Sequence, residues 1–282
     1  MSKIRELFGR STATGSIDWL AESSRQNCPF LGRKCIKIRK SQPAISIGTC
    51  VVAHGKDDAP IVICPHRILE RGQIFTDCLF LLTAHEPGNE LHIVPEISIP
   101  GGNVDYFLTS VRNQKVMDFV GIELQTLDTT GTVWPERQRF LRDAGLHIDD
   151  PAVESSRKYG INWKMNAKTI LVQLHHKIET FENLNKRLVL VIQDGLLEYM
   201  KRAFRFEHFR QAVLGDSMHI HSYRMDEQDD ATLRIELDSR FSTDANGIAA
   251  CLGLQAGARV ALEEIIARLE GKISEDTLFS FS

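Results

Sequence analysis

Hydrophobic and polar residues alternate along much of the middle of the chain, and alternation with a period of two is typical of β-strands. Five segments carry a strand pattern: residues 91–99, 104–110, 116–126, 187–193 and 232–237. The segment at 187–193 contains an unbroken apolar run, which predicts a buried strand. Turn sequences, Pro100-Gly101-Gly102 and Arg112-Asn113-Gln114, separate the first three segments.

Apolar residues at helical spacing predict helices in other parts of the chain. These helices are expected at residues 18–24, 163–181, 196–206 and 255–269, with a further short amphipathic helix at the start of the chain. Residues 67–87 fit either a helix or a strand, and residues 128–159 form a long polar stretch without clear periodicity. The order of strands, helix, buried strand and helix predicts an α/β core with a small cysteine-bearing subdomain near its N-terminal end.

The composition is that of an ordinary globular protein, because 43% of the 282 residues are hydrophobic and 25% are charged. The net charge of −3 excludes a uniformly basic protein that coats nucleic acid by bulk charge. A DNA-binding enzyme remains possible, since only its docking cleft needs positive potential. Without a long apolar stretch or a secretory leader, the sequence predicts a cytoplasmic protein with no membrane segment.

Four of the six cysteines are clustered near the N-terminus, at Cys28, Cys35, Cys50 and Cys64. In a reducing compartment, such clustering favours a metal site over a set of disulfides. Four thiolates bind iron or zinc in a tetrahedron, and such a site would hold together the loop-rich segment 28–66. The alternative is that these cysteines are simply small buried apolar residues, as is expected for Cys78 and Cys251.

Acidic residues at the strand segments are candidates for a second metal site. Asp105 lies in the second segment, and Glu123 shares one strand face with Gln125 in the third. If the two strands are neighbours, Asp105 and Glu123 can converge on a Mg²⁺ ion, which would polarise a phosphodiester. This is the arrangement of an Asp…Glu-x-Lys nuclease site with glutamine in the lysine position. The alternative is that the acidic residues are ordinary solvent-facing side chains.

Taken together and in this order, the two features resemble the NotI-type family of type II restriction endonucleases. The residues that carry the resemblance lie in the blocks 28–31, 35–37, 48–52, 62–67, 103–106 and 120–128. The resemblance implies a PD-(D/E)xK nuclease core, a mixed sheet flanked by helices, with a small rubredoxin-like subdomain that holds iron on the four cysteines. It also implies a boundary between an N-terminal region, residues 1–80, and a nuclease core, residues 81–282.

The resemblance assigns roles to particular residues of the core. Asp105 and Glu123 would hold the catalytic Mg²⁺, Gln125 would complete the triad, and Glu90 would stand where the family carries another glutamate of the site, with Glu96 as a competing candidate. Members of the family cut GC-rich palindromes built around GGCC and leave four-base 5′ overhangs. A homodimer is expected, because a two-fold symmetric protein reads a palindrome most simply.

Basic residues beyond the carboxylates are candidates for DNA contacts. Arg137 and Arg139 are expected in a loop just past the catalytic strand, and Lys164 and Lys168 share one face of the predicted helix. The alternative is that they are ordinary solvated side chains, which need no function. Two other functions remain open, a metal-stapled DNA-binding or regulatory protein without cleavage activity and a repair-type nuclease.

Overall fold

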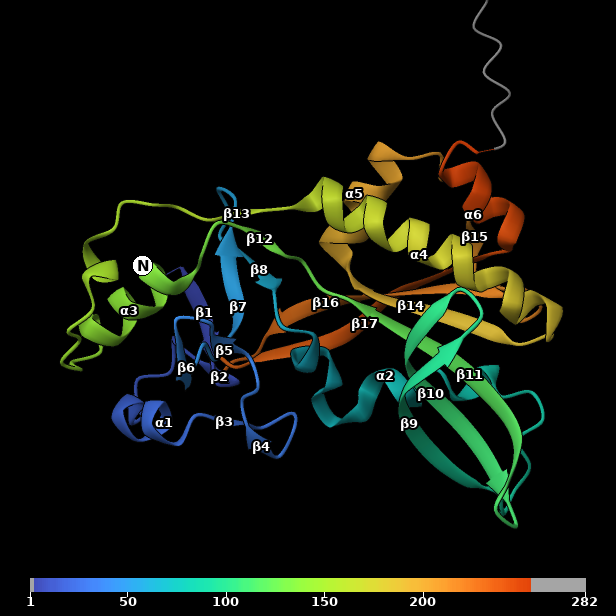
Figure 1. The fold of residues 1–282 in the computed structure, drawn as a ribbon, viewed down its shortest axis with the longest axis horizontal. Helices are drawn as coiled ribbons and strands as arrows, with labels where there is room; N and C mark the ends of the chain where they lie inside the picture. Colours follow the sequence, from blue (N-terminus) through green and yellow to red (C-terminus); the bar gives the residue numbers. More distant parts are fainter. Residues whose placement is uncertain (1–2, 255–282) are drawn as a thin grey trace, which may run out of the picture.

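The computed structural model describes residues 3–254, and its largest element is a mixed seven-stranded sheet (Figure 1). The strand order is β15-β17-β16-β14-β11-β10-β9, in which β11, β14 and β16 are parallel and the other neighbours are antiparallel. The strands are β9 (Glu90–Ile99), β10 (Gly102–Arg112), β11 (Lys115–Gln125), β14 (Arg187–Gln193), β15 (Arg210–Gln211), β16 (Met218–Glu227) and β17 (Leu233–Thr243). The five predicted strand segments are therefore confirmed, with the last one longer than expected.

Two tight turns make β9, β10 and β11 a continuous antiparallel meander. The turn between β9 and β10 contains Gly101 and Gly102, both with positive φ, and the turn between β10 and β11 contains Asn113 and Gln114, also with positive φ. Glycine and asparagine tolerate this backbone conformation better than other residues. The chain then crosses from β11 to the parallel strand β14 through helix α4 (Trp163–Asn183), as a parallel connection requires.

Helices cover one face of the large sheet and short helical turns cover the other (Figure 1). On one face, α4 packs beside α5 (Asp194–Ala203) and α6 (Ala245–Cys251), and their apolar residues form one cluster with β14. On the other face lie η1 (Pro65–Gly72), α2 (Gln73–Thr76) and η2 (Leu79–Leu81), packed against Ile122 and Val189. The predicted helices at 163–181 and 196–206 are confirmed, and residues 67–87 form these short helical turns.

A smaller sheet is built from the N-terminal part of the chain, in the order β2-β1-β7-β8. Its strands are β1 (Ile4–Leu7), β2 (Arg10–Ser11), β7 (Thr49–His54) and β8 (Ala59–Val62). The helix predicted at the start of the chain is wrong, because Ile4 and Leu7 are fully buried and β1 pairs with β7. A four-residue strand buried on both faces cannot be told from a helical turn by apolar spacing alone. The helix predicted at 18–24 is confirmed as α1 (Trp19–Arg25).

Short paired strands and two further helical segments complete the described chain. The pairs are β3 (Asn27–Cys28) with β4 (Arg33–Lys34), β5 (Ile38–Arg39) with β6 (Gln42–Ser46), and β12 (Thr129–Thr130) with β13 (Gly160–Ile161). The polar stretch 128–159, which showed no periodicity, nevertheless contains helix α3 (Trp134–Asp143) and η3 (Pro151–Glu154). Helix α3 escaped prediction because two of its buried residues, Arg137 and Gln138, are polar.

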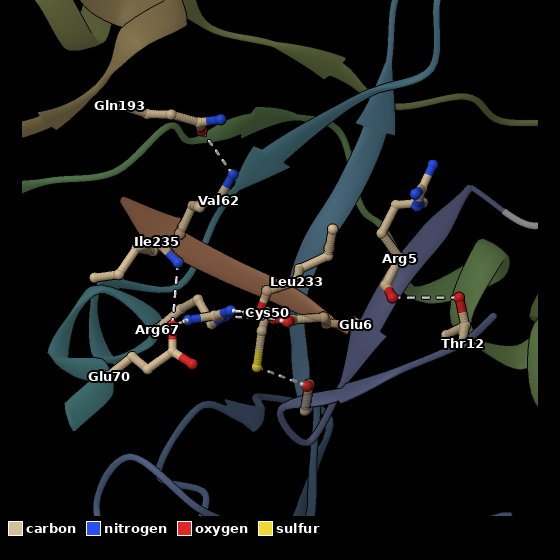
Figure 2. A network of polar contacts seen from close by, with 11 residues as sticks. Arg5, Glu6, Thr12, Cys50, Val62, Arg67, Glu70, Gln193, Leu233 and Ile235 are labelled. Carbon is tan, nitrogen blue, oxygen red and sulfur yellow. Dashed lines mark hydrogen bonds and ion pairs between the residues drawn. The ribbon is translucent and has the colours of Figure 1, made fainter. Parts of the chain in front are cut away.

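A buried polar network joins the small sheet to the large one (Figure 2). Arg67 donates to both carboxylate oxygens of Glu6 on β1, at 2.6 and 3.0 Å, to Glu70 at 2.8 Å, and to a backbone carbonyl of β17. Nearby, the side chain of Gln193 at the end of β14 accepts from the backbone amide of Val62 at 2.9 Å. These contacts fix the cysteine-bearing region against the sheet that carries the candidate carboxylates.

The helix predicted at 255–269 lies outside the described residues. Within residues 3–254, none of the helices combines the length and apolar character needed to cross a bilayer.

Candidate functional site

Adjacent strands bring Asp105 and Glu123 together. In the antiparallel pair of β10 and β11, Tyr106 lies opposite Ile122, and the same register continued by one residue sets Asp105 opposite Glu123. The Asp105 carboxylate accepts a hydrogen bond from the backbone amide of Leu124 at 2.8 Å. Its negative charge also raises the pKa of Glu123. The condition that the sequence analysis set for a shared site, that these two strands be neighbours, is therefore met.

Strand alternation turns Glu123 toward helix α4. Its neighbours Ile122 and Leu124 pack on the opposite face, in the cluster with α2. Glu123 is only 4% exposed, and this burial is the main reason that its pKa rises to about 7. The repulsion from Asp105 acts in the same direction. A carboxylate with this pKa is only about half ionised near neutral pH, so a nearby cation has a large effect on its charge.

Lys177 supplies a cation at this position. It lies on α4, is itself 5% exposed, and its Nζ donates to Glu123 Oε1 at 2.6 Å. This ion pair lowers the pKa of Glu123 and so partly offsets the effect of burial. Lys177 was not among the residues expected from the sequence, although a signal was available. Lys177 falls three residues after Leu174 and four before Phe181, within the buried stripe of the helix, and a lysine there needs a buried anionic partner.

Gln125, the third residue of the expected triad, follows Glu123 on the same strand face. Its side-chain amide donates to the backbone carbonyl of Thr126 at 2.5 Å. The side chain is half-buried and carries no charge, so it can orient a water molecule but cannot serve as a cation.

Of the two glutamates left open by the resemblance, Glu90 begins β9 and Glu96 lies six residues further along the same strand. Glu90 is exposed, pairs across the strands with Val111 at the far end from Asp105, and contacts His92 at 3.2 Å. The pairing of Tyr106 with Pro95 continues by one residue to set Glu96 opposite Asp105. Burial raises the pKa of Tyr106, and the charges of Asp105 and Glu96 raise it further. The strand register therefore places Glu96, and not Glu90, opposite Asp105.

The chemistry of the donor set fits Mg²⁺. Within the described residues, no group of three or more His, Cys, Asp or Glu side chains is arranged to hold a metal ion. Mg²⁺ does not require one, because it usually keeps several waters and binds through one or two carboxylates and the phosphates of the substrate. Asp105 and Glu123 provide two carboxylates whose mutual repulsion a divalent cation would relieve.

Near the N-terminus, the four clustered cysteines are buried and lie near one another. Cys28, Cys35, Cys50 and Cys64 are each at most 9% exposed. Burial raises the pKa of Cys28, and the charges of Cys35 and Cys64 add to this effect. The thiols of Cys50 and Cys64 share a hydrogen bond, which lowers the pKa of Cys64 to about 6 and raises that of Cys50. The thiols are thus neighbours, but they do not form a four-ligand geometry.

The comparison with protein families agrees with this combination of features. A family model described as Restriction endonuclease NotI matches residues 19–230, which is most of the 282-residue chain. The chain belongs to the NotI restriction endonuclease family. It is therefore a type II restriction endonuclease, a site-specific deoxyribonuclease that acts on double-stranded DNA. The match also extends beyond residues 28–128, over which the sequence resemblance was clear, and includes α4 with Lys177. Among curated proteins, no match was found.

The basic residues proposed to contact DNA in this NotI-family enzyme have different environments. Arg137 and Arg139 do not lie in a loop, as expected, but on helix α3. Arg137 is 3% exposed, its Nε donates to the carbonyl of Ile47 at 2.7 Å, and burial lowers its pKa to about 10. Arg139 donates to the carbonyl of Ser155 at 2.8 Å. Both guanidinium groups therefore hold neighbouring backbone in place, because their donors are engaged within the protein.

The two lysines proposed to contact DNA differ from these arginines, because their side chains are exposed. Lys164 and Lys168 lie on α4, both are exposed, and one helical turn separates them. They are on the same helix as Lys177 but are not buried with it. Their ammonium groups are accessible to a phosphate backbone, which the buried Arg137 is not.

Proposed function

We propose that this restriction endonuclease cleaves DNA with a Mg²⁺ ion held by Asp105 and Glu123. The observation that carries the proposal is the convergence of these two carboxylates from β10 and β11 in one register. Asp105 repels Glu123, which is largely removed from water, and a divalent cation bound between the two would relieve this repulsion beyond what the ion pair with Lys177 provides. A site for a divalent cation explains why the sequence places them there.

The chemistry follows from the contacts of each side chain. When bound, Mg²⁺ polarises the scissile phosphate and lowers the pKa of an attacking water. Asp105 is held in position by the amide of Leu124, and Glu123 by Lys177. Gln125, on the same face as Glu123, has an amide that can orient the water molecule. Of the two candidate glutamates, we propose Glu96 as the third carboxylate, since the strand register favours it over Glu90.

The target and the assembly are proposed from the family resemblance. We expect a GC-rich palindrome containing GGCC, cut to leave 5′ overhangs by a homodimer in which each protomer cleaves one strand. Lys164 and Lys168 are proposed to contact the DNA backbone, which their exposure supports. Arg137 and Arg139 are not retained in this proposal, because they are bound to backbone carbonyls of the protein itself.

We further propose that the four N-terminal cysteines hold one iron or zinc ion. The support is that all four are buried and that their thiols influence one another's pKa. Such an ion would stabilise the loop-rich segment from β3 to β8, in which three of the six strands are only two residues long. The test is elemental analysis of the purified protein, together with its visible absorption spectrum. A ferric tetrathiolate absorbs in the visible range, a zinc protein is colourless, and a metal-free folded protein would refute the proposal.

Cleavage can be tested by digesting a plasmid with the purified protein in the presence of Mg²⁺. Sharp bands are expected, and sequencing of their ends gives the target and the overhang. Asp105→Asn and Glu123→Gln should abolish the bands without loss of circular dichroism. Glu96→Gln should slow cleavage, and Glu90→Gln serves as the control at the start of β9. Tight DNA binding without cleavage would instead indicate a regulatory protein, and a smear would indicate a nuclease without a fixed target.

A further inference from the structure

We propose that Lys177 replaces the lysine of an Asp…Glu-x-Lys nuclease site, a position that Gln125 occupies in this chain. The cation of the site then comes from helix α4 and not from β11. This inference rests on the proposed function, since it concerns the site formed by Asp105 and Glu123. The observation behind it is the contact of 2.6 Å between Lys177 Nζ and Glu123 Oε1, with both side chains about 5% exposed.

The position of Lys177 is fixed by the turn between β9 and β10. Thr180, one helical turn further along α4, donates its hydroxyl to the carbonyl of Pro100 at 3.0 Å. A Cβ atom at Gly101 would lie 2.1 Å from the carbonyl oxygen of His176, and one at Gly102 would lie 3.3 Å from Cε of Lys177. The two glycines therefore let the turn press directly on the helix at Lys177. As a result, the carbon chain of the lysine is confined where it meets Glu123.

The contact between Lys177 and Glu123 leaves each group with atoms that can bind a ligand. A lysine ammonium has three N–H donors, and the bond to Glu123 uses one of them. A carboxylate has two oxygens, and the bond from Lys177 to Oε1 leaves Oε2 for a metal ion. Lys177 can thus hold Glu123 in its ligating orientation while it presents a positive charge to the phosphate. Gln125 can do neither electrostatic task, because its amide is neutral.

A purely structural ion pair would have the same distance, so the two roles must be separated by measurement. The variants are Lys177→Met, and Lys177→Met combined with Gln125→Lys, which moves the ammonium from the helix to the strand. Lys186→Met is the matched control, because Lys186 pairs with Asp118 at 2.6 Å on the same strand β11, away from the carboxylate pair. Each variant is assayed for single-turnover cleavage and, without DNA, for Ca²⁺ affinity by titration calorimetry.

The two readouts are expected to change in opposite directions. Lys177→Met should slow cleavage by on the order of 100-fold. At a pH high enough that Glu123 is ionised in both proteins, it should nevertheless bind Ca²⁺ about tenfold more tightly, because a positive charge next to the ligand has been removed. The double variant should recover at least about tenfold of the cleavage rate and lose the extra Ca²⁺ affinity. Lys186→Met should match the unmodified protein in both assays.

The inference is overturned if Lys177→Met cleaves at the rate of the unmodified protein, or if Ca²⁺ affinity does not rise and Gln125→Lys restores nothing. Should Lys177→Met fail to fold, Lys177→Gln replaces it, since glutamine keeps a donor toward Glu123 but carries no charge. Failure of the proposed function is distinguishable. In that case the unmodified protein itself would neither cleave nor bind Ca²⁺ in a manner sensitive to Asp105→Asn.

Discussion

Replacement of Arg67 by methionine is expected to be among the most destabilising single substitutions in this protein. Arg67 is 1% exposed and makes a bidentate ion pair with Glu6, whose side chain is 3% exposed. Methionine fills a similar volume but leaves the Glu6 carboxylate buried without its partner. Removing one member of a buried, hydrogen-bonded ion pair typically costs about 3–5 kcal/mol.

The protonation of Glu6 gives an independent value for the free-energy cost of Arg67→Met. The buried Glu6 can avoid an unpaired charge by taking up a proton, and its ordinary pKa is 4.5. Keeping such a group protonated at pH 7 costs about 1.4 kcal/mol for each of roughly 2.5 pH units, or about 3.5 kcal/mol. The two values agree, so we expect a loss of about 3 kcal/mol in the free energy of unfolding at neutral pH.

The pH dependence gives the prediction its sharpest test. A carboxyl whose pKa is raised by folding favours the folded state most below pH 4.5, and this contribution is lost as the pH rises. Without Arg67 the pKa of Glu6 should rise further, so the cost of Arg67→Met should shrink by up to about 1.4 kcal/mol for each pH unit between pH 7 and pH 5. Urea unfolding, followed by tryptophan fluorescence at several pH values, measures it.

Two further variants isolate the cause. Adding Glu6→Gln to Arg67→Met should recover part of the loss and remove its pH dependence, because the buried charge is gone. Arg224→Met breaks an ion pair of 2.6 Å whose side chains are 46% and 42% exposed, and should cost less than about 1 kcal/mol. A cost at Arg67 as small as that at Arg224, or one that does not vary with pH, would refute the reasoning.

Three further predictions concern the carboxylate site and the packing around it. Because the pKa of Glu123 is about 7, the affinity of the metal-free protein for Ca²⁺ should fall about tenfold from pH 8 to pH 6, and a flat calorimetric profile would contradict this. Gly121→Val should destabilise the protein by several kcal/mol in urea unfolding, since a Cβ there would lie 2.4 Å from the ring of Phe181, whereas Gly215→Ala, in open space, should have little effect. Tyr159→Phe removes a hydroxyl that donates to a β7 carbonyl at 2.7 Å and should lower the melting temperature by an amount corresponding to about 1 kcal/mol.

Much of the core could be predicted from local pattern. The strand at 187–193 and the helix beginning at Trp163 begin at the expected residues, because unbroken apolar runs and helical spacing depend only on neighbours in the sequence. Prediction failed where burial involved polar residues or very short elements. Helix α3 buries Arg137, and β1 is only four residues long. Both are stabilised by distant partners, which no local window contains.

Some features of the carboxylate site could likewise be predicted from the sequence, and others depended on tertiary structure. Strand alternation alone set Glu123 and Gln125 on one face, and it made Asp105 their candidate partner on the condition that the two strands were neighbours. The choice between Glu90 and Glu96 depended on the register of β9 with β10, which the sequence left open. The role of Lys177 depended on how α4 crosses the sheet, since it meets Glu123 from 54 residues away in the chain.

The sequence by itself determined which residues are chemically capable of the reaction, namely two acids and a glutamine on strands and a cluster of thiols near the N-terminus. It did so because residue type and spacing are properties of the chain alone. Tertiary structure decided which of these groups meet, how far each is removed from water, and which cation compensates the buried acid. These depend on strand pairing and helix packing, in which contacts form between segments that are far apart in sequence.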